Sequence, residues 1–164
     1  MTKHIIRNAK DADFPSIIEL NKCFVHFTSE MDQQGVTVLD TLSCFHKVVE
    51  FEGQVVAFVL AIDAKKNYNS VNYQWFKQRY HDFIYIDRIV IGAGRQGKGL
   101  GRMLYKSLFD YAEKNHFKRI ACEFDIKPPN EVSASFHRGF GFYQVGTQEL
   151  KGGKKAVSLQ VADI

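Results

Sequence analysis

The order of apolar and polar positions divides the chain into short strands and amphipathic helices. Runs rich in β-branched and aromatic residues indicate strands, and apolar residues that recur at helical spacing indicate helices. We predict strands at 4–7, 47–51, 54–62, 83–91, 119–126, 142–150 and 156–162, and helices at 11–24, 36–45, 100–112 and after Asn130. The strand at 83–91 is apolar at nearly every position, which is typical of a central strand covered on both faces.

A glycine-rich segment, Gly92 to Arg102, lies between this strand and the helix that follows it. It holds five glycines within ten residues, together with the cations Arg95, Lys98 and Arg102. Glycines let backbone amides turn towards a ligand, and a helix N-terminus carries about half a positive charge. The segment therefore predicts a seat for a phosphate or pyrophosphate. The alternative is a tight turn that needs glycine for its dihedral angles alone.

Two known phosphate-binding patterns fit this segment in part. Gly92, Gly94 and Gly97 match the dinucleotide fingerprint G-x-G-x-x-G, but too few βαβ units follow for a doubly wound domain. The start of the Walker A pattern also fits, although Gly99 follows Lys98 where a hydroxyl would bind magnesium. An NAD-binding oxidoreductase therefore remains a minor alternative, and nucleotide hydrolysis is not expected.

A third pattern covers Gln96 to Gly101, which resembles the Q/R-x-x-G-x-G/A signature of the GNAT superfamily of N-acetyltransferases. Further along, the spacing of Asn130, Ser133, Phe136, Gly141 and Phe142 is similar to the second coenzyme-binding motif of that family. The resemblance spans nearly the whole chain. It implies an α/β (α+β) fold in which a mixed central sheet of about six to seven strands is flanked by about four helices.

The resemblance also implies acetyl-coenzyme A as cosubstrate. Amides of the glycine segment would hold its pyrophosphate, Ile91 its pantetheine arm, and the backbone N–H of Ile89 the thioester carbonyl. The residues that it assigns to coenzyme binding are Ile89, Val90, Ile91, Gln96, Gly97, Lys98, Gly99, Leu100, Gly101, Arg102, Asn130, Ser133 and His137. The implied reaction is direct transfer of an acetyl group to a primary amine. A non-catalytic coenzyme A sensor is the alternative from another class.

Three side chains are candidates for proton transfer. His137 stands where the family usually has a tyrosine that protonates the departing thiolate, and an imidazole can do the same work or be structural. Asp87 shares its strand face with Ile89 and is the first candidate for the base that deprotonates the amine. Its alternative role is a buried ion pair with a cation from a neighbouring element. Glu123, on the next predicted strand, is the reserve base.

The segment 63–82 is the least regular part of the chain and is rich in aromatic residues. One interpretation makes these residues a wall of the acceptor pocket, because aromatic side chains offer contact area and a polar handle. The other is a surface helix that docks on the core. The residues concerned are Tyr68, Tyr73, Trp75 and Phe76.

Composition limits the remaining classes. A chain of 164 residues with 45% hydrophobic content fits a single domain over 1–164. The sequence shows no apolar membrane span or signal peptide, so we expect a cytoplasmic protein. Despite a net charge of +4, no basic run with interleaved aromatics predicts nucleic-acid binding. Three scattered cysteines predict neither a disulfide framework nor a metal site. The acceptor is expected to be a small-molecule or peptide amine, and a homodimer is compatible with the sequence.

Overall fold

The fold is an α/β arrangement built on a mixed sheet. A computed structural model describes residues 3–24 and 28–164 of the chain. The strands are β1 (Ile5–Asn8), β2 (Phe45–Phe51), β3 (Gln54–Asp63), β4 (Ile84–Ile91), β5 (Arg119–Lys127), β6 (Tyr143–Leu150) and β7 (Lys155–Asp163). The helices are α1 (Phe14–Lys22), α2 (Gln33–Leu42), α3 (Val71–Lys77), α4 (Leu100–Lys114) and α5 (Glu131–Gly139), with short 3-10 turns η1 (Asp11–Asp13) and η2 (Lys151–Gly153). The strand order is β1-β2-β3-β4-β5-β7-β6, in which β4 and β5 are parallel, so the predicted mixed sheet is confirmed.

Contacts within the chain define two compact units. The first comprises Met1–Ile62 and Ile86–Tyr111, and the second Asp63–Tyr85 and Ala112–Ile164. Strand β4 contributes to both units, since Ile84 and Tyr85 pair with β5 in the second unit. Single-domain organisation over 1–164 stays a prediction.

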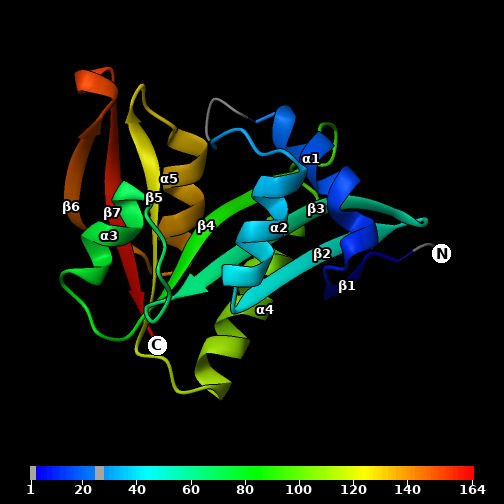
Figure 1. The fold of residues 1–164 in the computed structure, drawn as a ribbon, viewed down its shortest axis with the longest axis horizontal. Coiled ribbons are helices and arrows are strands. Elements are labelled where there is room, and N and C mark those ends of the chain that lie inside the picture. Colours follow the sequence, from blue (N-terminus) through cyan, green and yellow to red (C-terminus); the bar gives the residue numbers. More distant parts are fainter. Residues whose placement is uncertain (1–2, 25–27) are drawn as a thin grey trace. The chain divides into compact units, whose positions relative to one another are not determined.

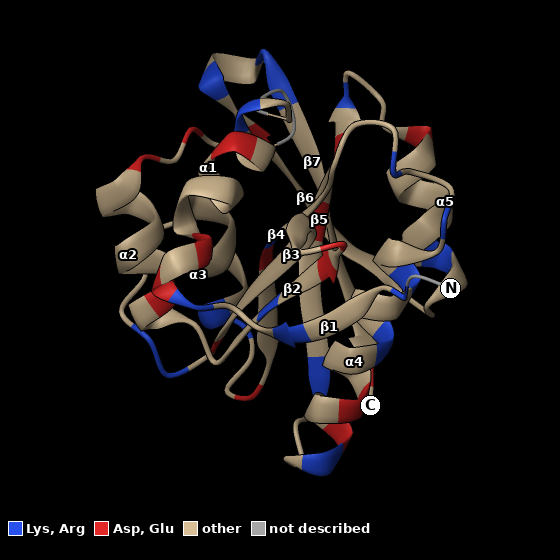
Figure 2. Cartoon of the chain, turned by 90° about the vertical axis from the view of Figure 1, so that its right-hand side faces the viewer, with Lys and Arg blue, Asp and Glu red and all other residues tan. Residues whose placement is uncertain are grey.

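The first unit is a layered αβα arrangement. Strands β1, β2 and β3 form an antiparallel meander in which Val48 pairs with Phe58. Helices α1 and α2 cover one face of these strands and α4 covers the other (Figures 1 and 2). Ile17 of α1, Val36 of α2 and Leu104 of α4 are fully buried, because each helix turns its apolar stripe towards the sheet.

Helix α2 lies a few residues earlier than the sequence pattern predicts. It begins at Gln33 because the side chain of Asp32 caps it, accepting a hydrogen bond of 2.7 Å from the amide of Gly35. It ends at Leu42 because Phe45 already belongs to β2, where it pairs with Ala61. The polar cap Asp32 therefore determines the start of α2, which the apolar pattern alone predicts too late in the sequence.

The second unit places β5, β7 and β6 between two helices. Strand β7 is antiparallel to both neighbours, and α3 and α5 lie on opposite faces of these strands (Figure 2). The irregular segment 63–82 contains α3, whose first turn is capped by Ser70. In the part of the chain that the structure describes, no helix is long and apolar enough to cross a membrane.

His46 of β2 is a buried ionisable residue that contacts α2. Its ring is 7% exposed and lies near Phe14 and Phe58, with centroid distances of 6.4 and 6.2 Å. Its Nδ1 is 2.7 Å from Oδ1 of Asp40 at the end of α2. Burial lowers the pKa of His46, and the hydrogen bond to Asp40 opposes that shift. The folded state therefore favours the neutral ring.

We expect the free energy of unfolding to decrease as pH falls through about 6.5, the ordinary histidine pKa. The folded pKa of His46 is lowered, so below that value the unfolded chain binds a proton that the folded ring resists. In His46→Gln this pH dependence is expected to weaken, whereas His81→Gln, at an exposed position, should leave it unchanged. Thermal unfolding between about pH 7.5 and about pH 5.5 measures the effect. Parallel curves for wild type and His46→Gln would contradict it.

Candidate functional site

The glycine segment begins with a backbone turn that excludes side chains. The amide of Gly92 donates a hydrogen bond of 2.9 Å to the carbonyl oxygen of Val56 in β3. A Cβ atom at Gly92 would lie 2.9 Å from that oxygen and 3.1 Å from Cδ2 of Leu20 in α1. A turn is closed by the amide of Arg95, which donates to the carbonyl of Gly92 at 3.0 Å. Glycine is therefore required where β4 ends.

The rest of the loop presents backbone amides at the start of α4. Gly94, Gly97 and Gly99 have φ angles of 76, 77 and 81°, which residues other than glycine rarely adopt. Met103 donates to the carbonyl of Gly99 at 3.0 Å and so starts the helical ladder. Within residues 3–24 and 28–164, the amides from Gly97 to Gly101 donate no hydrogen bond. Together with the positive end of the helix, they suit an anion such as a pyrophosphate.

Two side chains fasten this loop to the strands beneath it. The amide nitrogen Nε2 of Gln96 donates to the carbonyl of Ile91 at 3.1 Å. The guanidinium of Arg95 lies over the ring of Phe51 at the end of β2, 4.7 Å from its centroid. Lys98 and Arg102 are exposed. Arg95, one of the three cations predicted to surround the phosphate, is therefore already in contact with an aromatic ring of the chain.

In the second half of β4, side chains alternate between the two faces of the strand. Asp87, Ile89 and Ile91 are half-buried, whereas Arg88 and Val90 are buried. This alternation puts Asp87 on the same face as Ile89 and Ile91, as the sequence pattern predicts. The strand is thus fully covered on one face and partly accessible on the other.

Asp87 is held in an ion pair with the next residue in the chain. Nε of Arg88 lies 2.7 Å from Oδ2 of Asp87, and the two side chains are 4 and 5% exposed. The guanidinium also donates to Oδ1 of Asn21 at 3.1 Å and to the carbonyl of Ser29 at 3.0 Å. Removing one partner of such a pair typically costs about 3–5 kcal/mol. Through these contacts of Arg88, the pair joins β4 to the end of α1.

Glu123 accepts hydrogen bonds from neutral donors in the second unit. Its Oε1 receives the hydroxyl of Tyr85 at 2.8 Å and Nδ2 of Asn72, in α3, at 3.0 Å. Nε2 of Gln148, in β6, donates to Oδ1 of Asn72 at 2.9 Å. Residues of β4 and α3 thus contact the carboxylate directly, and β6 is linked to it through Asn72. Sequence reasoning found Glu123 but missed Asn72, Tyr85 and Gln148, because nothing in their local pattern marks them.

The second motif lies at the start of α5. Oδ1 of Asn130 caps the helix by accepting the amide of Ser133 at 3.2 Å, and the amide of Asn130 donates to the carbonyl of Asp125 at 3.0 Å. These contacts fix where the helix starts after the break at the two prolines. Asn130 is thus the N-cap of α5, and coenzyme contact by Asn130 and Ser133 stays a prediction.

His137 is 4% exposed and is enclosed by aromatic rings. Its centroid lies 5.6 Å from that of Phe124 and 5.2 Å from that of Phe142. Nδ1 is 2.7 Å from the carbonyl oxygen of Ser133, so Nδ1 carries the proton and Nε2 is the acceptor. Burial lowers the pKa of His137, against which the Ser133 bond acts weakly. These features favour the structural alternative, while its role as a general acid stays a prediction.

The aromatic residues of segment 63–82 are largely part of the core. Tyr73 and Phe76 are fully buried, and the hydroxyl of Tyr73 donates to the carbonyl of Asp63 at 2.7 Å. Trp75 lies between Gly146 of β6, where its indole leaves no room for a side chain, and the guanidinium of Arg79 at 3.8 Å. These contacts favour docking. Tyr68, half-buried with its ring centroid 5.4 Å from that of Tyr73, and Trp75 keep part of their surface exposed.

Comparison with known proteins identifies the family. A sequence profile of the acetyltransferase (GNAT) family matches residues 6–142. The chain belongs to this family. Phosphinothricin N-acetyltransferase of Streptomyces coelicolor is 39% identical over 66 residues, which are 40% of this chain and 37% of that protein. Membership confirms the acyltransferase class predicted from the sequence.

Solved structures of GNAT proteins share the fold. The ribosomal-protein-S18-alanine N-acetyltransferase of Escherichia coli has a TM-score of 0.75 at 14% identity, covering 99% of this chain and 94% of its own. A putative acetyltransferase of Salmonella typhimurium, solved with its cofactor acetyl-CoA, has a TM-score of 0.74 at 19% identity, covering 98 and 94%. Naa50 of Arabidopsis thaliana, in complex with a bisubstrate analogue, has a TM-score of 0.76 at 16% identity, covering 98 and 99%. At these identities the likeness establishes the fold alone.

Replacing Gly92 with alanine is expected to destabilise the GNAT chain by about 1–3 kcal/mol, the usual cost of an inserted methyl group in a packed site. For a chain of this size, each kcal/mol lowers the melting temperature by about 2–4 °C. Gly139→Ala is the control, since nothing lies within 4 Å of a Cβ there and alanine favours a helix. Equal melting temperatures for Gly92→Ala and wild type would show that Val56 and Leu20 move aside.

Proposed function

We propose that this GNAT protein transfers an acetyl group from acetyl-coenzyme A directly to a primary amine. The observation that carries the proposal is the run of backbone amides from Gly97 to Gly101, which makes no hydrogen bond within the described chain and precedes a long helix. Such a seat fits a pyrophosphate in charge and in donor geometry. Family membership supplies the independent support.

Each coenzyme contact is assigned to a particular part of the chain. Amides of Gly97 to Arg102 would hold the pyrophosphate, while the backbone of Val90 and Ile91 would hold the pantetheine arm. The N–H of Ile89 would donate to the thioester carbonyl and stabilise the negative charge that develops there during transfer. Asn130 and Ser133 complete the assigned contacts. Bound acetyl-coenzyme A supplies the activated acetyl group.

The amine must lose a proton before it can attack, because alkylammonium groups are charged at neutral pH. Of the two candidate bases, we place Glu123 ahead of Asp87. Oδ2 of Asp87 lies 2.7 Å from Nε of Arg88, so this oxygen is already occupied by a contact within the chain. Glu123 accepts hydrogen bonds from the hydroxyl of Tyr85 and from the side-chain amide of Asn72. After the transfer, His137 or water would protonate the thiolate.

The acceptor is a small-molecule or peptide amine. By their names, relatives and structural neighbours act on both kinds: one on phosphinothricin, another on an alanine of ribosomal protein S18. Tyr68 and Trp75 keep exposed surface that could contact such an acceptor. We further propose a cytoplasmic location and leave a homodimer as a prediction.

Binding of acetyl-coenzyme A is expected to raise the melting temperature. A ligand at about a hundred times its dissociation constant adds about 2.7 kcal/mol, which corresponds to roughly 5–10 °C here. NAD and magnesium-ATP at the same concentration should give no shift. Gly99→Ala, in the loop, is expected to lose most of the shift, whereas Gly53→Ala, with a similar positive φ in the β2–β3 turn, should retain it. A shift with NAD alone would refute the proposed function.

Substitution of the base is expected to lower the rate of acetyl transfer most at low pH. Glu123→Gln is expected to slow acetyl transfer by about 100-fold or more near pH 6, and less near pH 9, where more of the amine is already neutral. Asp87→Asn should show a smaller loss with little pH dependence. Release of free thiol in the presence of an amine measures the rate. A loss that is the same at both pH values for Glu123→Gln would remove it as the base, and retention of the acetyl-coenzyme A shift controls for folding.

A further inference from the structure

The coenzyme loop, residues 93–99, is exposed along most of its length. It runs between two buried residues, Gly92 and Leu100. The structure describes all seven of its positions, of which Arg95 alone is half-buried and the other six are exposed. Three of the seven are glycines, which have the widest choice of backbone conformations. Holding such a loop in one shape costs conformational entropy, so a side chain that anchors it affects how well it binds a ligand.

The side chain of Arg95 reaches the end of β2. Its Cζ atom lies 4.7 Å from the ring centroid of Phe51, the last residue of that strand. The stem of Arg95 packs beside the turn at Gly92, where a Cβ atom would lie 3.8 Å from its Cγ. A guanidinium over an aromatic ring is attracted by the negative face of the ring. The middle of the coenzyme loop is thus tied to the sheet by a side chain, in addition to the backbone bond of Gly92 at its start.

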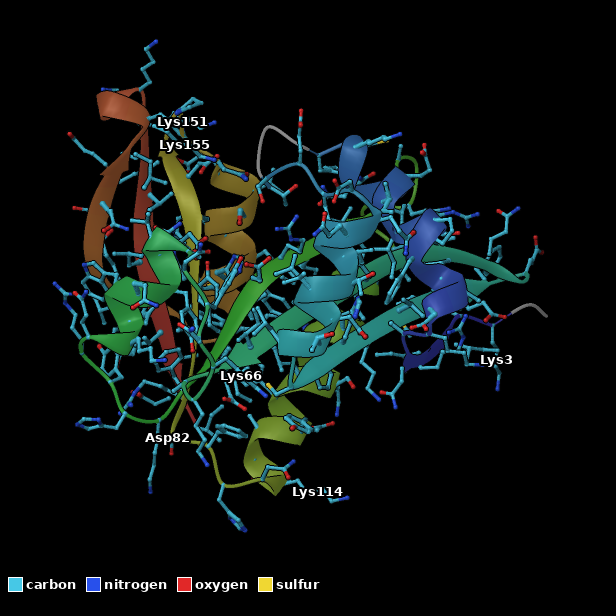
Figure 3. All side chains as sticks on the ribbon, in the orientation of Figure 1. Lys3, Lys66, Asp82, Lys114, Lys151 and Lys155 are labelled. Carbon is cyan, nitrogen blue, oxygen red and sulfur yellow. The ribbon has the colours of Figure 1, made fainter. Side chains whose placement is uncertain are left out.

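Phe51 is itself held in place from two directions. Its backbone pairs with Gln54 across the β2–β3 hairpin. The ring of His4 stacks on that of Phe51, with a centroid distance of 4.7 Å and an interplanar angle of 26°. Lys3, the residue before His4, lies at the same end of the first unit as this hairpin (Figure 3). His4, Phe51 and Arg95 all belong to the first compact unit. The ring is therefore a fixed platform for the guanidinium.

The shape of the loop matters because its amides must meet the ligand together. The amides from Gly97 to Gly101 donate no hydrogen bond to the part of the chain that the structure describes, and Arg95 lies two residues before the first of them. The other side-chain anchor is the hydrogen bond from Gln96 to Ile91, whose donor is exposed, so water competes for it. The apparent dissociation constant rises as the fraction of molecules in the competent shape falls.

We propose that Arg95 and Phe51 are positioning residues of the coenzyme site. Their stacking holds the loop in the shape that binds the pyrophosphate, and so sets the affinity for acetyl-coenzyme A. Arg95 acts through the loop and not as a phosphate ligand. Neither side chain touches the reacting atoms, so the effect falls on KM for the coenzyme and not on kcat. This inference rests on the proposed function, and Phe51 lies outside both family motifs.

A double-mutant cycle on coenzyme A binding tests the inference. Dissociation constants are measured by isothermal titration calorimetry for wild type, Phe51→Leu, Arg95→Gln and the double variant. Each single change is expected to raise Kd about fivefold, equivalent to ~1 kcal/mol and typical of a cation–π contact. The double variant should bind about as weakly as either single variant, because each change breaks the same contact. Multiplied effects, about 25-fold in total, would show that Arg95 binds phosphate by its own charge and would overturn the inference. A wild-type Kd for Phe51→Leu would overturn it as well.

Two further variants control for charge and for packing. Lys47→Gln removes a cation from another ring of β2, since Nζ of Lys47 lies 5.6 Å from the centroid of Phe45, and should leave Kd unchanged. Phe51→Tyr keeps an aromatic face and is expected to retain the wild-type Kd. An increase with Lys47→Gln as large as that with Arg95→Gln would refute the inference, because any lost cation would then weaken binding. If Phe51→Leu fails to fold, Phe51→Met takes its place in the cycle, because methionine fills irregular gaps without an aromatic face.

Steady-state rates supply a readout that general destabilisation would not produce. For Phe51→Leu, KM for acetyl-coenzyme A is expected to rise about fivefold, while kcat at saturating coenzyme stays within about twofold of wild type. A fall in kcat with an unchanged KM would contradict the positioning role. The thermal shift of the wild-type chain with acetyl-coenzyme A, measured first, separates the two failures. Its absence refutes the proposed function, whereas its presence together with multiplied effects in the cycle refutes this inference alone.

Discussion

The close approach of β3 to the end of β4 is the constraint on which the coenzyme loop depends. At Gly92 the backbone lies against the carbonyl of Val56 and the side chain of Leu20, so no Cβ atom fits. The chain must therefore leave the sheet at this point, and the next residues are free to turn their amides towards the N-terminus of α4. Gln96 and Arg95 then fasten the loop to Ile91 and Phe51. A loop held before a ligand arrives loses less entropy on binding it.

The two buried carboxylates show how environment separates residues of the same chemical type. Asp87 is compensated by a full positive charge, and that charge in turn anchors Asn21 and Ser29, so the pair contributes to architecture. Glu123 is oriented by a phenol and an amide. Buried ionic groups add little to stability on balance, and their value lies in orientation and specificity. On that reasoning Asp87 contributes to the framework, while the role of either carboxylate as the base stays a proposal.

Local sequence patterns predicted what local forces determine. The strands, the glycine loop and the N-cap of α5 follow from alternation, from glycine spacing and from Asn130, each within a few residues. The partner of Asp87 could not be predicted in this way, because neighbouring residues on a strand normally point to opposite faces. The role of α3 could not be decided from the sequence. The spacing of Tyr73 and Phe76, both fully buried, fits a helix docked on the core and a wall of the acceptor pocket equally well. The start of α2 depended on one polar cap, Asp32, outside the apolar pattern.

Recognition by backbone and recognition by side chains leave different traces in a sequence. An anion seat made of amides needs glycines at fixed spacing, so the coenzyme loop can be read from a single continuous stretch. The hydrogen-bonded cluster of Asn72, Tyr85, Glu123 and Gln148 needs no such stretch. Asn72 and Glu123 are 51 positions apart and Asn72 and Gln148 are 76 apart, and the sheet register brings them together. Each polar residue costs free energy to bury unless its partners are present, so the cluster persists as a set. The same physics explains why an anion-binding loop can be predicted from one stretch of sequence, whereas these side-chain contacts become visible only once the strands are paired.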